Sequence, residues 1–230
     1  MYRLGNKILS LNNKPFYSYG GGPAETFIYA TGGTVTTDGD YRIHKFTTVG
    51  NSTFTIIQAG TGANDSIEYL IVAGGGGGGG CSGSRYNYAG GGGAGGMLEG
   101  YVTGNTTGAK TITVGAGGIG GRYSLFNGND NSGTAENGGN SSALGISATG
   151  GGAAGDAYDL NRVNYINANA GGSGGGGARQ SAGVGKGGGG TAGEGNNGSN
   201  AQVAGQGGGG GGKSAVGAVV TGGAGKSNSI

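Results

Sequence analysis

One segment of this chain has the residues and spacing of a nucleotide-binding motif. Gly207, Gly212, Lys213 and Ser214 satisfy the phosphate-loop pattern G-x-x-x-x-G-K-S. A phosphate loop needs a hydrophobic strand before it and a helix after it. The preceding residues 201–206 are polar and interrupted by glycine, and residues 215–220 are β-branched and also contain glycine. Because glycine makes up 67 of the 230 residues, the match is expected by chance, and we do not expect nucleotide binding.

The residues most often used in catalysis and metal binding are scarce. His44 is the only histidine and Cys81 the only cysteine. A cysteine nucleophile needs a base and an orienting acid beside it, and His44 lies far from Cys81 in the sequence. We therefore predict that the chain is not an enzyme and that it holds neither a cofactor nor a metal.

Aromatic inserts between glycine runs are better candidates for function. Tyrosine gives a large contact area at low entropic cost, and Tyr, Asn, Ser and Gly together are typical of binding loops. The alternative is that these side chains cap the glycine-rich part or fill an interface between subunits. The residues expected to bind a receptor are Arg85, Tyr86, Tyr88, Tyr123, Phe126, Tyr158, Arg162 and Tyr165.

The glycine runs must hold these inserts in place. Glycine loses more backbone entropy on ordering than other residues, which costs about 0.5–1 kcal/mol relative to alanine in a helix or strand. Disorder is disfavoured because the net charge is only +2. Collagen is excluded by the lack of a strict glycine period and by the presence of only two prolines. The longest runs are residues 74–80, 90–93, 174–177, 187–190 and 207–212.

Composition divides the chain into two regions. Residues 1–73 are rich in β-formers, and we expect them to be an attachment or oligomerisation region. Segments 41–47 and 53–57 predict a hairpin, and 67–73 predicts a strand in a buried central position. Residues 74–230 predict a glycine-rich domain with recognition loops. Within it, 97–102 and 110–114 are expected to be strands, and no segment has a helical period.

The predicted fold class is mainly β and irregular, without substantial α-helix. For the glycine-rich region we expect a bundle of polyglycine-II-type helices with loops at its ends. Such helices have three residues per turn and no internal hydrogen bonds, so their backbone groups must pair with neighbouring runs. In an up-and-down bundle, the three aromatic inserts would share one end.

Several segments in order along residues 40–215 resemble the glycine-rich domain of bacteriophage tail-fibre and receptor-binding proteins. The resemblance rests on Ile43–Thr47, on Glu68–Ala73 leading into glycines, on Thr111–Gly118, and on Asn137–Ser142 followed by Ile146–Gly152. It implies a virion surface protein in which glycine runs form a polyglycine-II bundle and loops at its end bind the host receptor. The first seventy residues have no match in the attachment domain of tip adhesins.

The expected function is host attachment by a phage tail fibre or fibre-tip protein. The expected partners are a host surface glycan or an outer-membrane protein, together with other virion tail proteins, and a homotrimer is favoured. No nucleic-acid partner and no membrane span are expected, and the protein would be made in the host cytoplasm. The alternative is a structural subunit of an extracellular filament or capsid-decorating fibre. An ice-binding protein is a minor alternative, disfavoured by the bulky Tyr and Arg inserts.

Overall fold

The computed structural model describes residues 2–5, 26–81, 87–122, 134–157, 166–180 and 183–228. The chain divides into two compact units. The first comprises Met1–Leu70 and Glu99–Ile112 with the terminal Ile230, and the second comprises Ile71–Leu98 and Thr113–Ser229. The chain therefore passes from one unit to the other after Leu70, after Leu98 and after Ile112.

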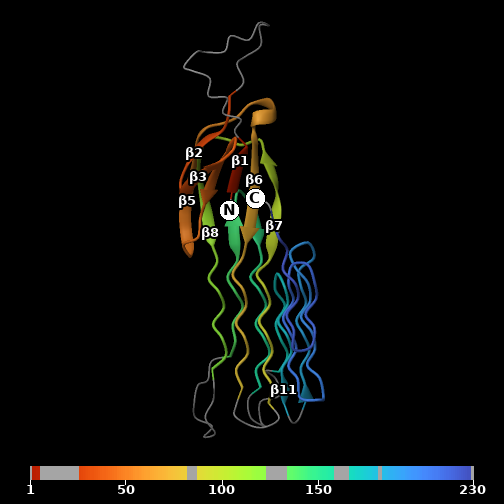
Figure 1. Ribbon diagram of the computed structural model, residues 1–230. Helices are drawn as coiled ribbons and strands as arrows, with labels where there is room; N and C mark the ends of the chain where they lie inside the picture. The colour runs from red at the N-terminus through yellow and green to blue at the C-terminus, as the bar shows by residue number, and fades with distance from the viewer. Residues whose placement is uncertain are drawn as a thin grey trace. The chain divides into compact units, whose positions relative to one another are not determined.

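Short strands form most of the first unit (Figure 1). In chain order, its strands and its one described 3-10 turn are β1 (Tyr2–Gly5), β2 (Tyr29–Thr31), β3 (Thr34–Asp38), β4 (Tyr41–Lys45), β5 (Gly50–Gln58), η1 (Gly62–Asn64), β6 (Ser66–Val72), β7 (Met97–Thr103) and β8 (Gly108–Val114). Within its described residues, the second unit adds two short hairpins, β9 (Ser141–Ala143) with β10 (Ile146–Ala148), and β11 (Arg179–Gln180) with β12 (Gly183–Val184).

Among the described residues, strands β1 to β10 form two five-stranded sheets. Their orders are β3-β4-β1-β6-β7 and β10-β9-β8-β5-β2. The predicted strand at 67–73 is confirmed as β6, which has neighbours on both sides and buries Ile67 and Ile71. The strands expected at 97–102 and 110–114 are confirmed as β7 and β8.

The hairpin expected between residues 41–47 and 53–57 is wrong. These segments form β4 and β5, which lie in different sheets. β4 pairs instead with β3 across a tight turn at Gly39, whose φ of 54° suits glycine. This shorter connection closes a hairpin before β5 begins, and β5 pairs with β2.

Side-chain burial along β5 of the first unit follows the two-residue period of a strand. Phe54 and Ile56 alternate with more exposed residues along β5, and Ile112 is buried on β8. His44 is also fully buried, and its ring packs edge-on against Phe54 with centroids 5.1 Å apart. The core of this unit is therefore conventional, built by aliphatic and aromatic side chains.

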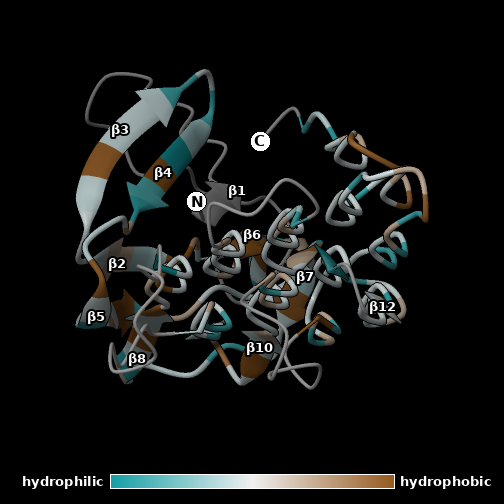
Figure 2. Cartoon of the chain, turned by 90° about the horizontal axis from the view of Figure 1, so that it is seen from below, coloured by the Kyte–Doolittle hydropathy of each residue, from teal (hydrophilic) through white to brown (hydrophobic). Residues whose placement is uncertain are grey.

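The second unit is built from backbone contacts between extended glycine runs. Figure 1 shows these runs as wavy segments lying side by side, and Figure 2 shows them end-on as small separate coils. Hydrogen bonds from one run to a given neighbour recur at every third residue. Along run 73–80, the N–H groups of Ala73, Gly76 and Gly79 donate to Gly96, Gly93 and Gly90.

The same run has further neighbours with the same period. Its Gly74 and Gly77 donate to the antiparallel run 134–140, and its carbonyls at Gly75 and Gly78 accept from Gly118 and Gly121 of a parallel run. From one residue of the run to the next, the backbone N–H and C=O groups therefore point towards different neighbouring runs. Successive runs alternate in direction, so the connections fall at two ends of the unit.

Close backbone approach explains why these positions are glycine. A Cβ added to Gly76 would lie 2.1 Å from the carbonyl oxygen of Gly152, and one on Gly176 would lie 1.9 Å from that of Gly208. Both distances are far below van der Waals contact. Most buried side chains within the unit are accordingly alanines, including Ala153, Ala154 and Ala178.

The described part of the chain is mainly β and contains no α-helix. Its only helical element is the single 3-10 turn η1. No helix in the described residues is long and apolar enough to cross a membrane.

Candidate functional site

The described flanks of all three aromatic inserts lie at one end of the second unit, which we call the loop end. Gly80 and Cys81 precede the first insert (residues 84–88), Gly121 precedes the second (122–127), and Ala157 and Ile166 are described residues near the two ends of the third (156–167). A β-bridge joins Cys81 to Ala157. The described residues beside the first and third inserts therefore lie together, and the shared end of the inserts themselves stays a prediction.

The carboxylate of Asp156 joins these flanks. Its Oδ1 accepts the N–H of Gly80 at 2.6 Å, and its Oδ2 accepts the N–H of Ala135 at 2.9 Å. Asp156 is 2% exposed. A Cβ on Gly121 would lie only 2.1 Å from Oδ1. One buried side chain thus contacts the runs that lead into or out of all three inserts.

Burial raises the pKa of the Asp156 carboxyl above its usual range, because the charged form loses hydration. The two N–H groups from Gly80 and Ala135 act in the opposite direction, since they stabilise the carboxylate, and their effect is the smaller. The group is therefore held in place by hydrogen bonds in a site that disfavours its charge.

A small apolar cluster lies beside this carboxylate. Ala157, Ile166 and Ala178 are buried together, and Cys81 packs against them. Ile166 lies near the end of the third insert, and its carbonyl accepts the N–H of Ala178 at 2.7 Å. Cys81 is a free thiol at this position, and its described contacts are those of a small apolar side chain.

Tyr88 lies where the first insert returns to a glycine run. Its backbone exchanges two hydrogen bonds with Arg179, each 2.8 Å long. The Arg179 guanidinium donates to the carbonyls of Gln180 and Gly183, which braces the β11–β12 hairpin. The Tyr88 ring is 39% exposed and lies against Gly205, where a Cβ would be 3.0 Å from its Cε2.

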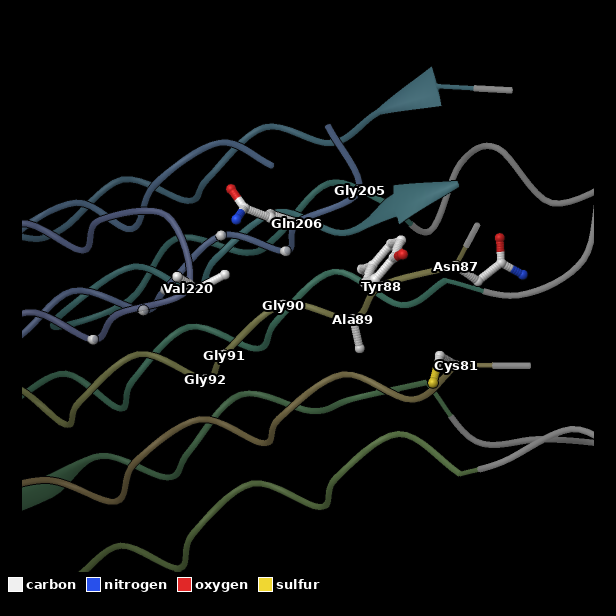
Figure 3. Close-up of a pocket in the computed structure, with 15 residues that line it drawn as sticks. Cys81, Asn87, Tyr88, Ala89, Gly90, Gly91, Gly92, Gly205, Gln206 and Val220 are labelled. Atoms are coloured by element: carbon white, nitrogen blue, oxygen red, sulfur yellow. The ribbon is translucent and has the colours of Figure 1, made fainter. Parts of the chain in front are cut away.

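An open groove of about 700 Å³ begins at Tyr88 and follows the glycine runs (Figure 3). Its walls are Gly90, Gly91 and Gly92 on one side and residues 205–210 on the other. The rest of the lining comes from Cys81, Asn87, Tyr88, Ala89, Val220 and Gly222. Apart from Tyr88 and a few side chains near the loop end, the groove is lined by peptide backbone.

Of the predicted receptor-binding residues, only Tyr88 is among those that the structure describes. The other seven lie outside the described residues: Arg85, Tyr86, Tyr123, Phe126, Tyr158, Arg162 and Tyr165. Their role stays a prediction.

The phosphate-loop pattern has a different structural context. Residues 206–212 form an extended run, and no helix follows in residues 213–228. Lys213 donates its Nζ to the carbonyls of Met97 and Gly193. Within the described residues, no group of three His, Cys, Asp or Glu side chains could hold a metal ion.

Asp156, Ile166 and Arg179 are not among the predicted receptor-binding residues. The signal for Asp156 was present, because it is an acidic residue directly after the glycine–alanine run 150–155. A carboxylate at the end of a run can accept N–H groups of neighbouring runs. The partners Gly80 and Ala135 had no such signal, since they are distant in sequence.

Comparison with known proteins gives one match. A family model described as a glycine-rich domain matches residues 46–229. No curated protein and no solved structure matches the chain.

Proposed function

The chain belongs to the glycine-rich domain family, and from this premise we propose that it is a non-enzymatic adhesion protein whose rigid glycine scaffold presents binding loops. The observation that carries the proposal is the meeting of all three insert flanks around Asp156. Loops held on a rigid scaffold are where recognition usually lies. The inserts leave this scaffold from a common base.

We propose that the scaffold is a bundle of polyglycine-II helices. The support is the hydrogen-bond period of three residues, which matches the three residues per turn of this conformation. Measurement of scalar couplings across hydrogen bonds by NMR tests it. Couplings from Gly74 to Gly139 and from Gly77 to Glu136 are expected, whereas couplings at alternate residues would indicate ordinary strands.

We further propose that the protein lies on the surface of a bacteriophage virion, in a tail fibre or its tip, and binds a glycan or outer-membrane protein of the host. This rests on the ordered resemblance of residues 40–215 to phage glycine-rich domains. Recognition would use stacking and hydrogen bonding by the tyrosine-bearing inserts, because tyrosine supplies contact area at low entropic cost. Such binding requires neither a cofactor nor a metal.

Binding of the fluorescently labelled full chain to a panel of intact bacteria tests this function. A triple variant Tyr86→Ser, Tyr158→Ser and Tyr165→Ser is expected to bind at least roughly thirtyfold more weakly, as for loss of a hot spot of about 2 kcal/mol. Tyr101→Ser is the matched control, because Tyr101 is 68% exposed and belongs to the first unit. Equal binding by the triple variant and the wild type would contradict the proposal.

A structural subunit of a filament or fibre is the second candidate function. It is favoured by exposed valines in the last runs, since Val203, Val216 and Val220 are 78%, 60% and 69% exposed. Apolar side chains at such positions are available for contacts between subunits. Filament formation by the purified chain, without binding to any cell type, would support this alternative.

A further inference from the structure

The run 206–212 is almost completely surrounded by other runs of the second unit. Its N–H and C=O groups point in directions that repeat every three residues. All carbonyls from Gly207 to Gly212 accept hydrogen bonds from described neighbours. Gly208 and Gly211 donate to Gly177 and Gly174, while Gly209 and Gly212 donate to Ala218 and Ala215.

The N–H groups that point in one of these directions have no described neighbour that accepts them. Among the described residues, the N–H groups of Gly207 and Gly210 have no hydrogen-bond acceptor. Both residues line the groove of Figure 3. The nitrogen of Gly210 lies 3.2 Å from the position that a Cβ on Gly91 would take, and Gly91 is on the opposite wall. Each backbone N–H group is a strong hydrogen-bond donor, so a row of such donors along an open groove can pair with the carbonyls of a further extended run.

The facing wall also has a backbone donor with no described acceptor. Gly91 and Ala94 donate to the run 206–212, and Gly90, Gly93 and Gly96 donate to another neighbour. Gly92 has no acceptor among the described residues. The other donors along these two walls that repeat every three residues all donate to an extended run of the same chain. The groove therefore has the backbone pattern of a seat for one more run.

The last run of the chain has the complementary pattern. Within the described part, the carbonyls of Gly222 and Gly225 accept no hydrogen bond, and both residues are exposed. They are three positions apart, as are Gly207 and Gly210. The segment Thr221–Gly225 reads T-G-G-A-G, so it brings few side chains into a groove walled by glycine.

We propose that the groove seats the 221–225 run of a second copy of this chain. Gly222 lines the groove in its own chain, so this run borders the seat. A twofold axis between the run and the groove then places each copy's run in the other's groove. Such an interface is self-complementary, as in most homodimers. It pairs the Gly207 and Gly210 donors with the partner's Gly222 and Gly225 carbonyls. The twofold differs from the trimer expected from the sequence.

The experiment compares the full wild-type chain with two glycine-to-leucine variants by sedimentation velocity. Gly222→Leu adds a side chain in the groove, and the fold tolerates a Cβ there because the nearest atom, the Gly210 carbonyl oxygen, is 3.9 Å away. Gly189→Leu is the matched control, because that exposed glycine has no atom within 4 Å and lies outside the groove lining. Circular dichroism and thermal melting establish that both variants fold.

The expected result is a species of twice the 21.7 kDa chain mass for the wild type and for Gly189→Leu. Gly222→Leu is expected to lose this dimer. On the wild type, a synthetic peptide of residues 219–228 in excess should compete for the seat and also dissociate the dimer. Amide hydrogen exchange followed by NMR should show Gly207 and Gly210 protected in the dimer and unprotected in Gly222→Leu.

Three outcomes would overturn the proposal. One is a wild-type chain that stays monomeric at all accessible concentrations. A second is an oligomer, including a trimer, that Gly222→Leu leaves intact. The third is rapid exchange of the Gly207 and Gly210 amides in an oligomeric wild type, because association would then use another surface. None of these readouts depends on host binding, so the interface and the adhesive role are tested separately.

Discussion

The Asp156 carboxylate accepts the N–H of Gly80 at 2.6 Å, across 76 positions of sequence. Its other oxygen accepts the N–H of Ala135. This one side chain therefore fixes the spacing between runs that carry three different inserts. The inserts can vary in sequence without changing these two hydrogen bonds, because Asp156 is the only insert residue that takes part in them.

Asp156→Ala should destabilise the second unit strongly. It leaves two backbone N–H groups without their acceptor, and each unsatisfied buried group costs about 1–3 kcal/mol. Urea unfolding measures the effect. Glu136→Ala is the control, because Glu136 is exposed on a neighbouring run and should change stability by less than about 0.5 kcal/mol. Equal midpoints for both variants would show that Asp156 does not hold the runs together.

The pH dependence of Asp156 has a definite sign. Its folded pKa is raised from 3.8 by burial, so the folded state binds more protons than the unfolded state just above that value. This group therefore contributes a loss of stability as pH rises from about 3.8 through the folded pKa. Asp156→Asn cannot titrate. We expect the difference in unfolding free energy between wild type and Asp156→Asn to change in this window, and a constant difference would contradict the assignment.

His44 should give the opposite trend in the first unit. Burial, and to a smaller extent Arg42, lower its pKa, while the hydrogen bond from Nδ1 to the Gly32 carbonyl raises it. The neutral ring is therefore the stable folded form. Its contribution is present above the unfolded value of 6.5 and is lost as pH falls from there towards the folded pKa. His44→Phe should flatten the stability profile below pH 6.5, and parallel profiles would refute this role.

Adjacent glycines in one run should respond differently to alanine. A Cβ on buried Gly77 would lie 2.0 Å from the Ile119 carbonyl oxygen, whereas one on exposed Gly78 meets no atom within 4 Å. Gly77→Ala should cost about 1–3 kcal/mol or more through overpacking. Gly78→Ala should be neutral or stabilising by about 0.4–1 kcal/mol, because alanine reduces the entropy of the unfolded chain. Thermal unfolding distinguishes them, and similar melting temperatures would be inconsistent with the close backbone packing.

Lys213 should act through structure rather than through phosphate binding. Its ammonium group donates to the carbonyls of Met97 and Gly193. Lys213→Met should lower the unfolding free energy by about 1–3 kcal/mol, because hydrogen bonds from a charged group are lost. Lys186→Met, at an exposed position, is the matched control. Calorimetry with ATP should detect no heat of binding for either the wild type or the variant, and saturable binding that Lys213→Met abolishes would contradict this role.

Local patterns predicted the elements of this fold better than their pairing. The β6, β7 and β8 segments have clear β-forming sequences. The separation of β4 from β5 did not follow from their β-forming sequences, because β4 pairs with β3 across the turn at Gly39 and β5 lies in the other sheet. The shared end of the inserts is predicted from alternating run directions. The role of Asp156 did not follow, because a glycine run carries no side-chain pattern that specifies which distant run lies beside it.

The hydrogen-bond period of the glycine runs also restricts how the bundle can change in length. Adding or removing one residue inside a packed run would turn every later donor and acceptor towards the wrong neighbour. In the proposed polyglycine-II arrangement, adding three residues to each run would restore the pairing and lengthen each run by about 9 Å, at a rise of about 3.1 Å per residue. The distance between the two ends of the second unit is therefore adjustable only in discrete steps, much as a coiled coil changes length by whole heptads.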